Sequence, residues 1–161
     1  MGWVDDWHGQ IVGLDTAPLI YYLEEHPTYL PLVDPFFDAL ARGDLHAVTS
    51  TVTLIEVLTQ PLRHDDAALA AQYRSVLLNN QGIGMQAVSV AIAEEAARLR
   101  ATYTLRTPDA VQLATALDAG ASAFLTNDAR LAAIPDLRVL VLDQVGTPAA
   151  PPDRGAPNAS A

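Results

Sequence analysis

Four acidic residues occupy positions from which they could act together in chemistry. Asp15 and Asp128 each follow a short apolar run, and Asp109 lies where a helix is expected to begin. Glu56 lies within the apolar segment 54–58, where an ionised side chain is costly unless it is paired or bound to a metal. We therefore take Asp15, Glu56, Asp109 and Asp128 as one candidate site.

The chemistry that such a group supports is the binding of a hard cation. Carboxylates brought together repel one another, and this repulsion is tolerable only when cations lie between them. The chain has no Cys, and its four His are scattered singly at His8, His26, His46 and His64, so a zinc site is not expected. Oxygen ligands favour Mg²⁺ or Mn²⁺ instead.

Short apolar strands that alternate with helices would bring these acids together. This alternation predicts a parallel sheet covered on both faces, and ligands bind at the carboxyl ends of its strands. The clearest local pattern is Thr107-Pro108-Asp109, interpreted as a capping residue, a proline at the first helical position and an acid at the second, opening a helix that runs to Gly120. We expect five strands, at 11–14, 47–49, 86–90, 123–126 and 138–142, and a loop at 79–84. Further helices are expected at 17–25, 29–42, 65–78 and 91–101. One more helix should start near Ser50, Thr51 or Thr53 and end at Pro61.

The chain is expected to form one three-layer α/β/α domain over residues 11–145. Residues 1–10 are an N-terminal extension, and residues 146–161 are a Pro/Ala-rich tail with the composition of a disordered segment. A basic leader followed by an apolar segment is absent, and no apolar run has membrane-spanning length. We expect a cytoplasmic protein with no membrane partner.

The charge composition excludes some classes of protein. The net charge of −10 argues against non-specific coating of DNA, but not against a nuclease, because carboxylates that hold cations contribute to that total. All nine basic residues are Arg. A P-loop NTPase and a Schiff-base enzyme are excluded, because both need a Lys.

The segments around the four acids resemble the PIN-domain family, and within it the VapC-type toxins of bacterial toxin–antitoxin pairs. The resemblance covers about residues 11 to 143, and the ordered set of motifs is more specific than any one of them. The residues up to Gln10 and the Pro/Ala tail depart from the family pattern. The matching segments are Leu14–Leu23, Thr49–Leu58, Leu105–Ala116 and Phe124–Asp128.

The resemblance implies a metal-dependent ribonuclease. It implies a central parallel sheet, Mg²⁺ or Mn²⁺ as cofactor, RNA as substrate, commonly a homodimer and, in VapC-type members, a cognate VapB-type antitoxin that blocks the site. Asp15 and Asp109 would be direct metal ligands, while Glu56 and Asp128 would complete or orient the metal shell. Hydrogen bonds from Thr16 and Thr126 would orient the acids, and Asn127 could share the role of Asp128. Candidates for phosphate contacts are Arg63, Arg74, Arg106 and Arg130.

Two alternatives remain open on the sequence. A phosphatase of the haloacid-dehalogenase type also places an Asp after its first strand, but its D-x-D motif is broken here by Ala17, and no Lys is present to support a phosphoaspartate. A catalytically silent binding module would keep the acids only as structural or partner-binding features.

Overall fold

The computed structural model describes residues 2–146, which form a five-stranded parallel sheet with the order β3-β2-β1-β4-β5. β1 (Ile11–Leu14) is central, between β2 (His46–Ser50) and β4 (Ala123–Thr126), while β3 (Ile83–Gln86) and β5 (Arg138–Val141) form the edges. The predicted fold class and strand number are confirmed. The helices are α1 (Thr16–Leu23), α2 (Leu30–Arg42), α3 (Thr51–Arg63), α4 (Ala67–Asn79), α5 (Val90–Thr102), α6 (Thr107–Asp118) and α7 (Leu142–Val145), with two 3-10 helices, η1 (Asp5–Trp7) and η2 (Ala129–Ala133).

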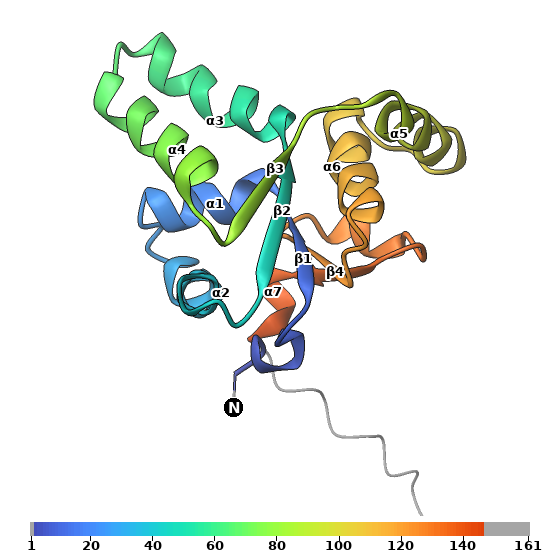
Figure 1. The fold of residues 1–161 in the computed structure, drawn as a ribbon, viewed down its shortest axis with the longest axis horizontal. Helices are drawn as coiled ribbons and strands as arrows, with labels where there is room; N and C mark the ends of the chain where they lie inside the picture. The colour runs from blue at the N-terminus through green and yellow to red at the C-terminus, as the bar shows by residue number, and fades with distance from the viewer. Residues whose placement is uncertain (1, 147–161) are drawn as a thin grey trace, which may run out of the picture.

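Helices cover both faces of the sheet, which makes three layers (Figure 1). α1 to α4 and α7 contribute to one apolar core, and α5, α6 and η2 contribute to the other. The strands supply both cores by alternation: in β4, Ala123 and Leu125 belong to the first core and Phe124 to the second. Burial on both faces explains why the central strand β1 and its neighbour β4 are mostly apolar.

Gly13 in the central strand allows α6 to pack closely against the sheet. A Cβ atom at this position would lie 2.6 Å from the Cβ of Ala116 and 2.7 Å from the ring of Phe124. Any larger residue would push α6 outward, and α6 carries Asp109 in its first turn. The glycine therefore helps to set the position of one candidate site residue.

The N-terminal segment, predicted as an extension, packs against the domain. Val4 and Trp7 are buried in the first core. The indole Nε1 of Trp3 donates to the carbonyl of Leu32 at 3.2 Å, and the Arg138 guanidinium lies 5.0 Å from the centre of the Trp7 ring. The predicted tail, 146–161, falls outside the described residues except for Gly146.

Three sequence predictions about local structure were wrong. The third strand was predicted at 86–90 but covers Ile83–Gln86, because Ser89 caps α5 by accepting a hydrogen bond from the backbone N of Ile92. α3 continues past Pro61 to Arg63 instead of ending there, and the Pro61 carbonyl accepts from the Asp66 amide at 2.9 Å. The cap of α6 is Arg106, not Thr107, and Asp109 is therefore the third helical residue.

Within residues 2–146, none of the helices is both long and apolar enough to cross a membrane.

Candidate active site

The predicted acids meet at the carboxyl edge of the sheet. Asp15 follows β1 and caps α1, Asp128 follows the neighbouring β4 and caps η2, and Asp109 lies in the first turn of α6. Glu56 reaches the same place from α3. A pocket of about 360 Å³ contains every predicted site residue; its lining includes Asp15, Thr16, Tyr21, Glu56, Arg106, Asp109, Thr126, Asn127 and Asp128.

Asp15 is held by a hydrogen bond to each of its carboxylate oxygens. Its Oδ1 accepts from the Thr16 amide at 2.8 Å, and its Oδ2 accepts from the Thr126 hydroxyl at 2.7 Å. The Thr126 hydroxyl also accepts from the Asp128 amide at 3.0 Å and so links two of the acids. Burial raises the pKa of Asp15, and the charges of Asp109 and Asp128 raise it further, while the two hydrogen bonds oppose this shift. The Asp15 carboxylate is therefore fixed in orientation by its two hydrogen bonds, and its negative charge would be stabilised by a nearby cation.

Glu56 corrects one sequence inference. Its apolar neighbours predicted a buried charge, but Glu56 is exposed, and Ile55 beside it is 67% exposed. Both residues belong to α3. The carboxyl end nevertheless loses part of its hydration, and this loss, followed by the nearby Asp15 charge, raises the pKa of Glu56. Glu56 thus belongs to the acidic pocket without being a core residue.

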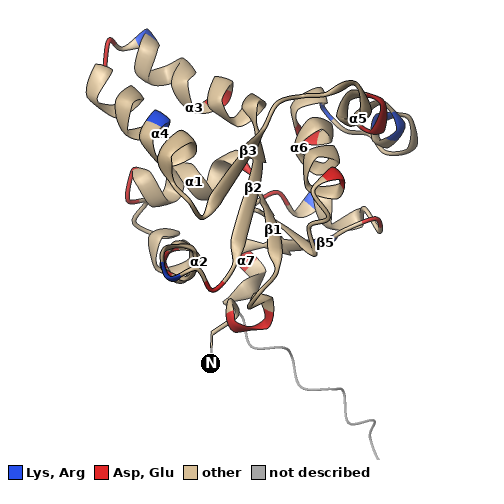
Figure 2. Cartoon of the chain, in the orientation of Figure 1, with Lys and Arg blue, Asp and Glu red and all other residues tan. Residues whose placement is uncertain are grey.

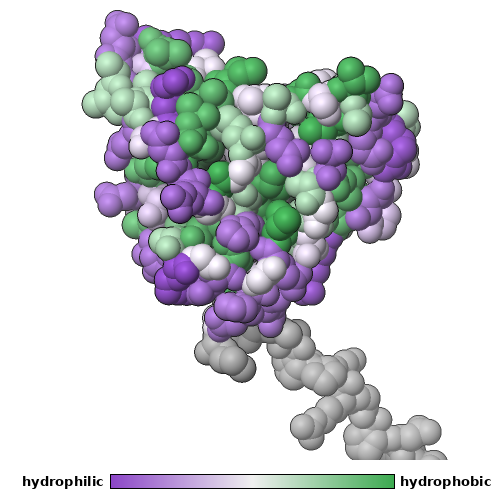
Figure 3. Space-filling view, viewed as in Figure 1, coloured by the Kyte–Doolittle hydropathy of each residue, from purple (hydrophilic) through white to green (hydrophobic). Residues whose placement is uncertain are grey.

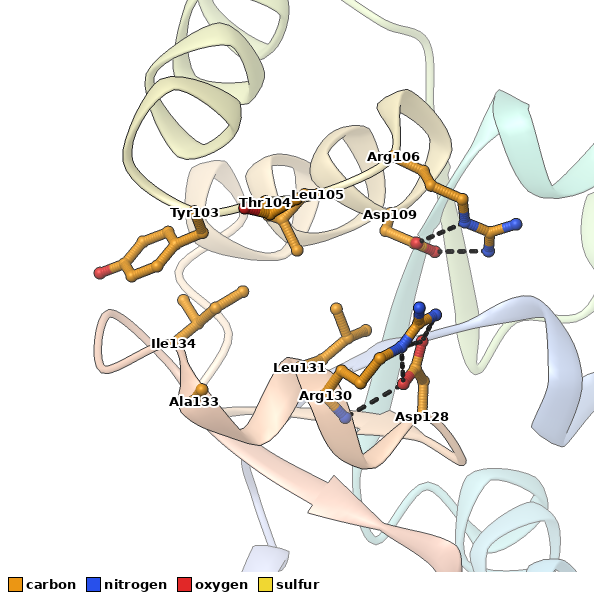
Figure 4. Close-up of a pocket in the computed structure, with 10 residues that line it drawn as sticks. All are labelled: Tyr103, Thr104, Leu105, Arg106, Asp109, Asp128, Arg130, Leu131, Ala133 and Ile134. Atoms are coloured by element: carbon orange, nitrogen blue, oxygen red, sulfur yellow. Dashed lines mark hydrogen bonds and ion pairs between the residues drawn. The ribbon is translucent and has the colours of Figure 1, made fainter.

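Two arginines neutralise the other two acids. The Arg106 Nε donates to Asp109 at 3.0 Å, and the Arg130 Nη2 donates to Asp128 at 2.6 Å (Figure 4). These bonds raise the pKa of both guanidinium groups, and the Arg130 bonds lower the pKa of Asp128. The side chains of Arg106 and Arg130 are 71% and 77% exposed, but those of Asp109 and Asp128 are only 11% and 25% exposed, so each acid would need another cation if its ion pair opened.

Both arginines were predicted as phosphate contacts, but their ion pairs with the acids were not predicted from the sequence. The signal was present, because Arg106 and Asp109 lie three residues apart at the start of a helix, and Arg130 follows Asp128 by two residues. Other arginines belong to α2, α3, α4 and α5 (Figure 2), and these include the predicted phosphate contacts Arg63 and Arg74, which do not line the acidic pocket. The two guanidinium groups are therefore the local source of positive charge beside the acids.

The residues present fit a hard divalent cation by their chemistry. The pKa values of Asp15 and Glu56 are raised mainly by burial and further by neighbouring negative charges, and a cation would offset both effects. The buried hydroxyl of Thr16 lowers the pKa of Glu56 by its proximity, but it makes no hydrogen bond of normal geometry. Across residues 2–146, no three acidic or histidine side chains already have the arrangement of a metal site. Asp109 and Asp128 face their arginines, so metal binding would require these two ion pairs to open.

Asn127 is held by contacts on both ends of its amide. Its Nδ2 donates to the Tyr21 hydroxyl at 3.4 Å, and its Oδ1 accepts from the Asp143 amide at 3.2 Å. The side chain lines the pocket while it joins α1 to α7. These contacts favour a positioning role over direct participation.

A buried polar network beneath the acids was not found from the sequence. The Thr49 hydroxyl donates to the Leu14 carbonyl at 3.0 Å and lies 2.7 Å from the Thr53 hydroxyl, which accepts from Gln112 Nε2. Thr49, Thr53 and Gln112 are at most 2% exposed. They connect the end of β1 to β2, α3 and α6, so the network joins the elements that carry Asp15, Glu56 and Asp109. Threonine and glutamine in predicted helices and strands gave no hint of this long-range pairing.

Comparison with known proteins identifies the family. The PIN domain family model matches residues 12–137, which include all four acids. No curated protein sequence matches the chain. 

Similar solved structures include toxins of toxin–antitoxin pairs. A toxin–antitoxin complex from Klebsiella pneumoniae is 23% identical, with a TM-score of 0.61 over 83% of this chain and 98% of that one. VapBC2 from Rickettsia felis, bound to a promoter DNA fragment, is 16% identical, with a TM-score of 0.63 over 81% and 98%. VapC20 from Mycobacterium tuberculosis, a toxin that cleaves the sarcin–ricin loop, is 16% identical, with a TM-score of 0.60 over 80% and 98%. The chain belongs to the PIN domain family and shares the fold of these solved toxin structures.

Proposed function

We propose that this protein is an endoribonuclease that depends on Mg²⁺ or Mn²⁺ and acts as the toxin of a VapBC-type pair. The observation that carries the proposal is the meeting of Asp15, Glu56, Asp109 and Asp128 in one pocket of a PIN domain. Acidic side chains with no thiolate and no paired imidazole are the donor set expected for these hard cations.

Each acid has a proposed task. Asp15 and Asp109 would hold the cation, with Glu56 and Asp128 completing or orienting its shell. Thr126 would fix the positions of Asp15 and Asp128 relative to each other through the hydrogen bonds it makes with both. When bound, the cation would activate a water molecule and stabilise charge on the phosphoryl oxygens. Partial burial, together with the charges of neighbouring acids, raises the pKa of Asp15 and Glu56, and a cation bound between the acids would relieve both costs.

The two arginines would change partners when substrate and cation bind. A cation held by Asp109 and Asp128 supplies the positive charge that Arg106 and Arg130 supply in the structure described here. The released guanidinium groups could then contact RNA phosphates, for which their forked geometry is well suited. This exchange would give an acidic protein a local RNA-binding surface.

A VapB-type antitoxin and a second copy of the chain are the proposed protein partners. The Klebsiella and Rickettsia structures are toxin–antitoxin complexes, which supports the first. Apolar residues gather along the surface formed by α3 and α4 (Figure 3), and Ile55 and Leu62 of α3 are more than 60% exposed. Apolar surface of this kind is typical of protein interfaces. Gel filtration of the purified chain, alone and with the product of a neighbouring small gene, tests both partners.

Incubation with RNA tests the proposed activity. Total tRNA and ribosomal RNA, incubated with Mn²⁺, should be cut into discrete fragments, and EDTA should prevent this. Mn²⁺ should also raise the melting temperature, because a ligand that binds only the folded state stabilises it. A silent binding module would leave RNA intact, and a phosphatase would release phosphate from a small phosphomonoester without cutting RNA.

A further inference from the structure

A second pocket adjoins the acidic one. It has a volume of about 190 Å³ and lies between two walls, residues 103–106 with the start of α6 on one side and η2 with Ile134 on the other (Figure 4). We call it the side cleft. It shares Arg106, Asp109 and Asp128 with the acidic pocket, so these three residues lie between the two spaces.

The side cleft differs from the acidic pocket in chemistry. Leu105 contributes to one wall, while Leu131 and Ile134, both buried, contribute to the other. Arg106 and Arg130 lie at the end where the cleft meets the acids (Figure 4). The space is therefore apolar inside and carries two guanidinium groups at its mouth. An apolar slot beside arginines suits a group that is flat and uncharged but attached to an anion.

The far end of the side cleft is braced. The Tyr103 hydroxyl donates to Asp136 at 3.2 Å, and Arg98 of α5 bonds both Asp136 at 2.6 Å and Glu95 at 2.6 Å. These contacts tie the residues that precede α6 to the segment that precedes β5. These contacts fix the spacing between the two walls, so the cleft is present without a ligand.

We propose that the side cleft binds the base of the nucleotide next to the phosphate that is cut. This inference rests on the proposed function, because it assumes that the scissile phosphate lies at the acidic pocket. Bases splayed from single-stranded RNA are commonly bound between apolar or aromatic side chains and arginine planes. Arg106 and Arg130 would hold the backbone phosphate at the mouth, while Leu105, Leu131 and Ile134 would contact the faces of the base. The side cleft would then set the base preference of cleavage.

Two neighbouring alanines of η2 provide a matched test. Ala133 lines the side cleft and Ala132 does not, and both are exposed. Ala133→Phe should fill the cleft, whereas Ala132→Phe adds the same ring outside it. Thr104→Tyr, on the opposite wall and also exposed, is a second filling variant in case the first one disturbs η2.

Two measurements are made on each variant. The first is the affinity for each of the four nucleoside 5′-monophosphates in the absence of metal, measured from changes in NMR chemical shifts. The second is the base preference at each position around the cut in a randomised RNA oligonucleotide pool with Mn²⁺. We expect the filling variants to bind the nucleotides at least tenfold more weakly and to lose preference at one position, while Ala132→Phe matches the wild type.

Three other results are informative. Unchanged nucleotide binding and base preference in both filling variants would overturn the proposal. Loss of binding to a cognate antitoxin, with RNA cleavage and nucleotide binding unaltered, would also overturn it and assign the cleft to the protein partner. A wild-type protein that cuts no RNA, but whose nucleotide binding is weakened by Ala133→Phe and not by Ala132→Phe, would support the base site and reject the nuclease.

Discussion

Two polar regions lie at the same edge of the sheet and differ in how their side chains are satisfied. In the acidic pocket, charged groups crowd together, and Thr16 Oγ1 is the one buried side-chain polar atom of residues 2–146 without a hydrogen bond. In the network of Thr49, Thr53 and Gln112, neutral groups bond to one another in the buried interior. The first arrangement costs stability, and the second provides it.

The neutral network holds the site together, whereas the acids are the groups that would act in it. The network connects β1, β2, α3 and α6, and it does so without any charge. Asp15 follows β1, Glu56 belongs to α3 and Asp109 to α6, while the fourth acid, Asp128, follows the neighbouring β4. The stability provided by the buried network offsets the cost of placing several acids together, and proteins commonly accept such a local cost at a functional site.

The largest expected effect is that of Asp15→Asn on RNA cleavage. Asn keeps the oxygen that accepts from the Thr16 amide but lacks the charge needed to hold a cation. We expect a loss of about 10³-fold in cleavage rate, as is reasonable when a metal that contributes several kcal/mol is held poorly. The measurement is the initial rate with Mn²⁺ on one RNA, with thermal melting as a check of folding.

Asp118→Asn is the control for that experiment. Asp118 is exposed at the opposite end of α6 from Asp109, so its removal changes the net charge equally but leaves the pocket intact. It should retain the wild-type rate. Full activity in Asp15→Asn would remove Asp15 from the site.

The next largest expected effect is the loss of stability when the Thr49–Thr53–Gln112 network is broken. Thr53→Val keeps the shape of the side chain but removes the hydroxyl that bonds Thr49 and Gln112. Leaving buried polar groups unpaired costs about 1–3 kcal/mol, so we expect a loss of this size in the free energy of unfolding, measured by urea denaturation. Thr59→Val, on the same helix and near the surface, should change it by less than about 0.5 kcal/mol. Equal effects in the two variants would show that the network has no special role.

The sequence predicted the regions of the site better than their surroundings. β1 and β4 were placed at their observed bounds, because a short apolar run that ends in an acid is a local pattern. β3 was misplaced because Gly82 and Gly84 resemble a turn, while Val88 and Val90 resemble a strand; pairing with β2 decides the matter. The exposure of Glu56 and the Thr49–Thr53–Gln112 network depend on packing between distant elements, which no single segment encodes.

A smaller effect concerns pH and the metal-free protein. The pKa of Asp15 and that of Glu56 are raised above 3.8 and 4.5 respectively, so both carboxyls bind protons more tightly in the folded state. The free energy of unfolding should therefore rise as pH falls through the raised values toward the ordinary ones. Asp128, with a lowered pKa, acts in the opposite sense, but its contribution is lost only below about 3.8.

Thermal melting in EDTA between pH 8 and pH 5 measures this dependence. The variant with both Asp15→Asn and Glu56→Gln should show a smaller increase in melting temperature as the pH falls than the wild type does. Asp118→Asn should follow the wild type. Parallel curves for all three proteins would show that crowding in the pocket does not affect stability.

The smallest and most specific effect is that of Arg130→Gln, since it tests the exchange of partners at the edge of the acidic pocket. Removing the guanidinium frees Asp128 for a cation, so Mn²⁺ should bind more tightly. RNA should bind more weakly, because a phosphate contact is lost, and we expect KM to rise about 3- to 10-fold with little change in kcat.

Arg42→Gln is the matched control, because Arg42 makes a comparable exposed pair with Asp44 far from the pocket, at 2.7 Å. It should alter neither Mn²⁺ binding, followed by titration calorimetry, nor KM. If Arg130→Gln weakened Mn²⁺ and RNA binding together, the arginine would have to support the metal-loaded site rather than compete with it. Opposite changes in the two affinities, absent in Arg42→Gln, would support a guanidinium that neutralises the acid in one state and contacts the substrate in the other.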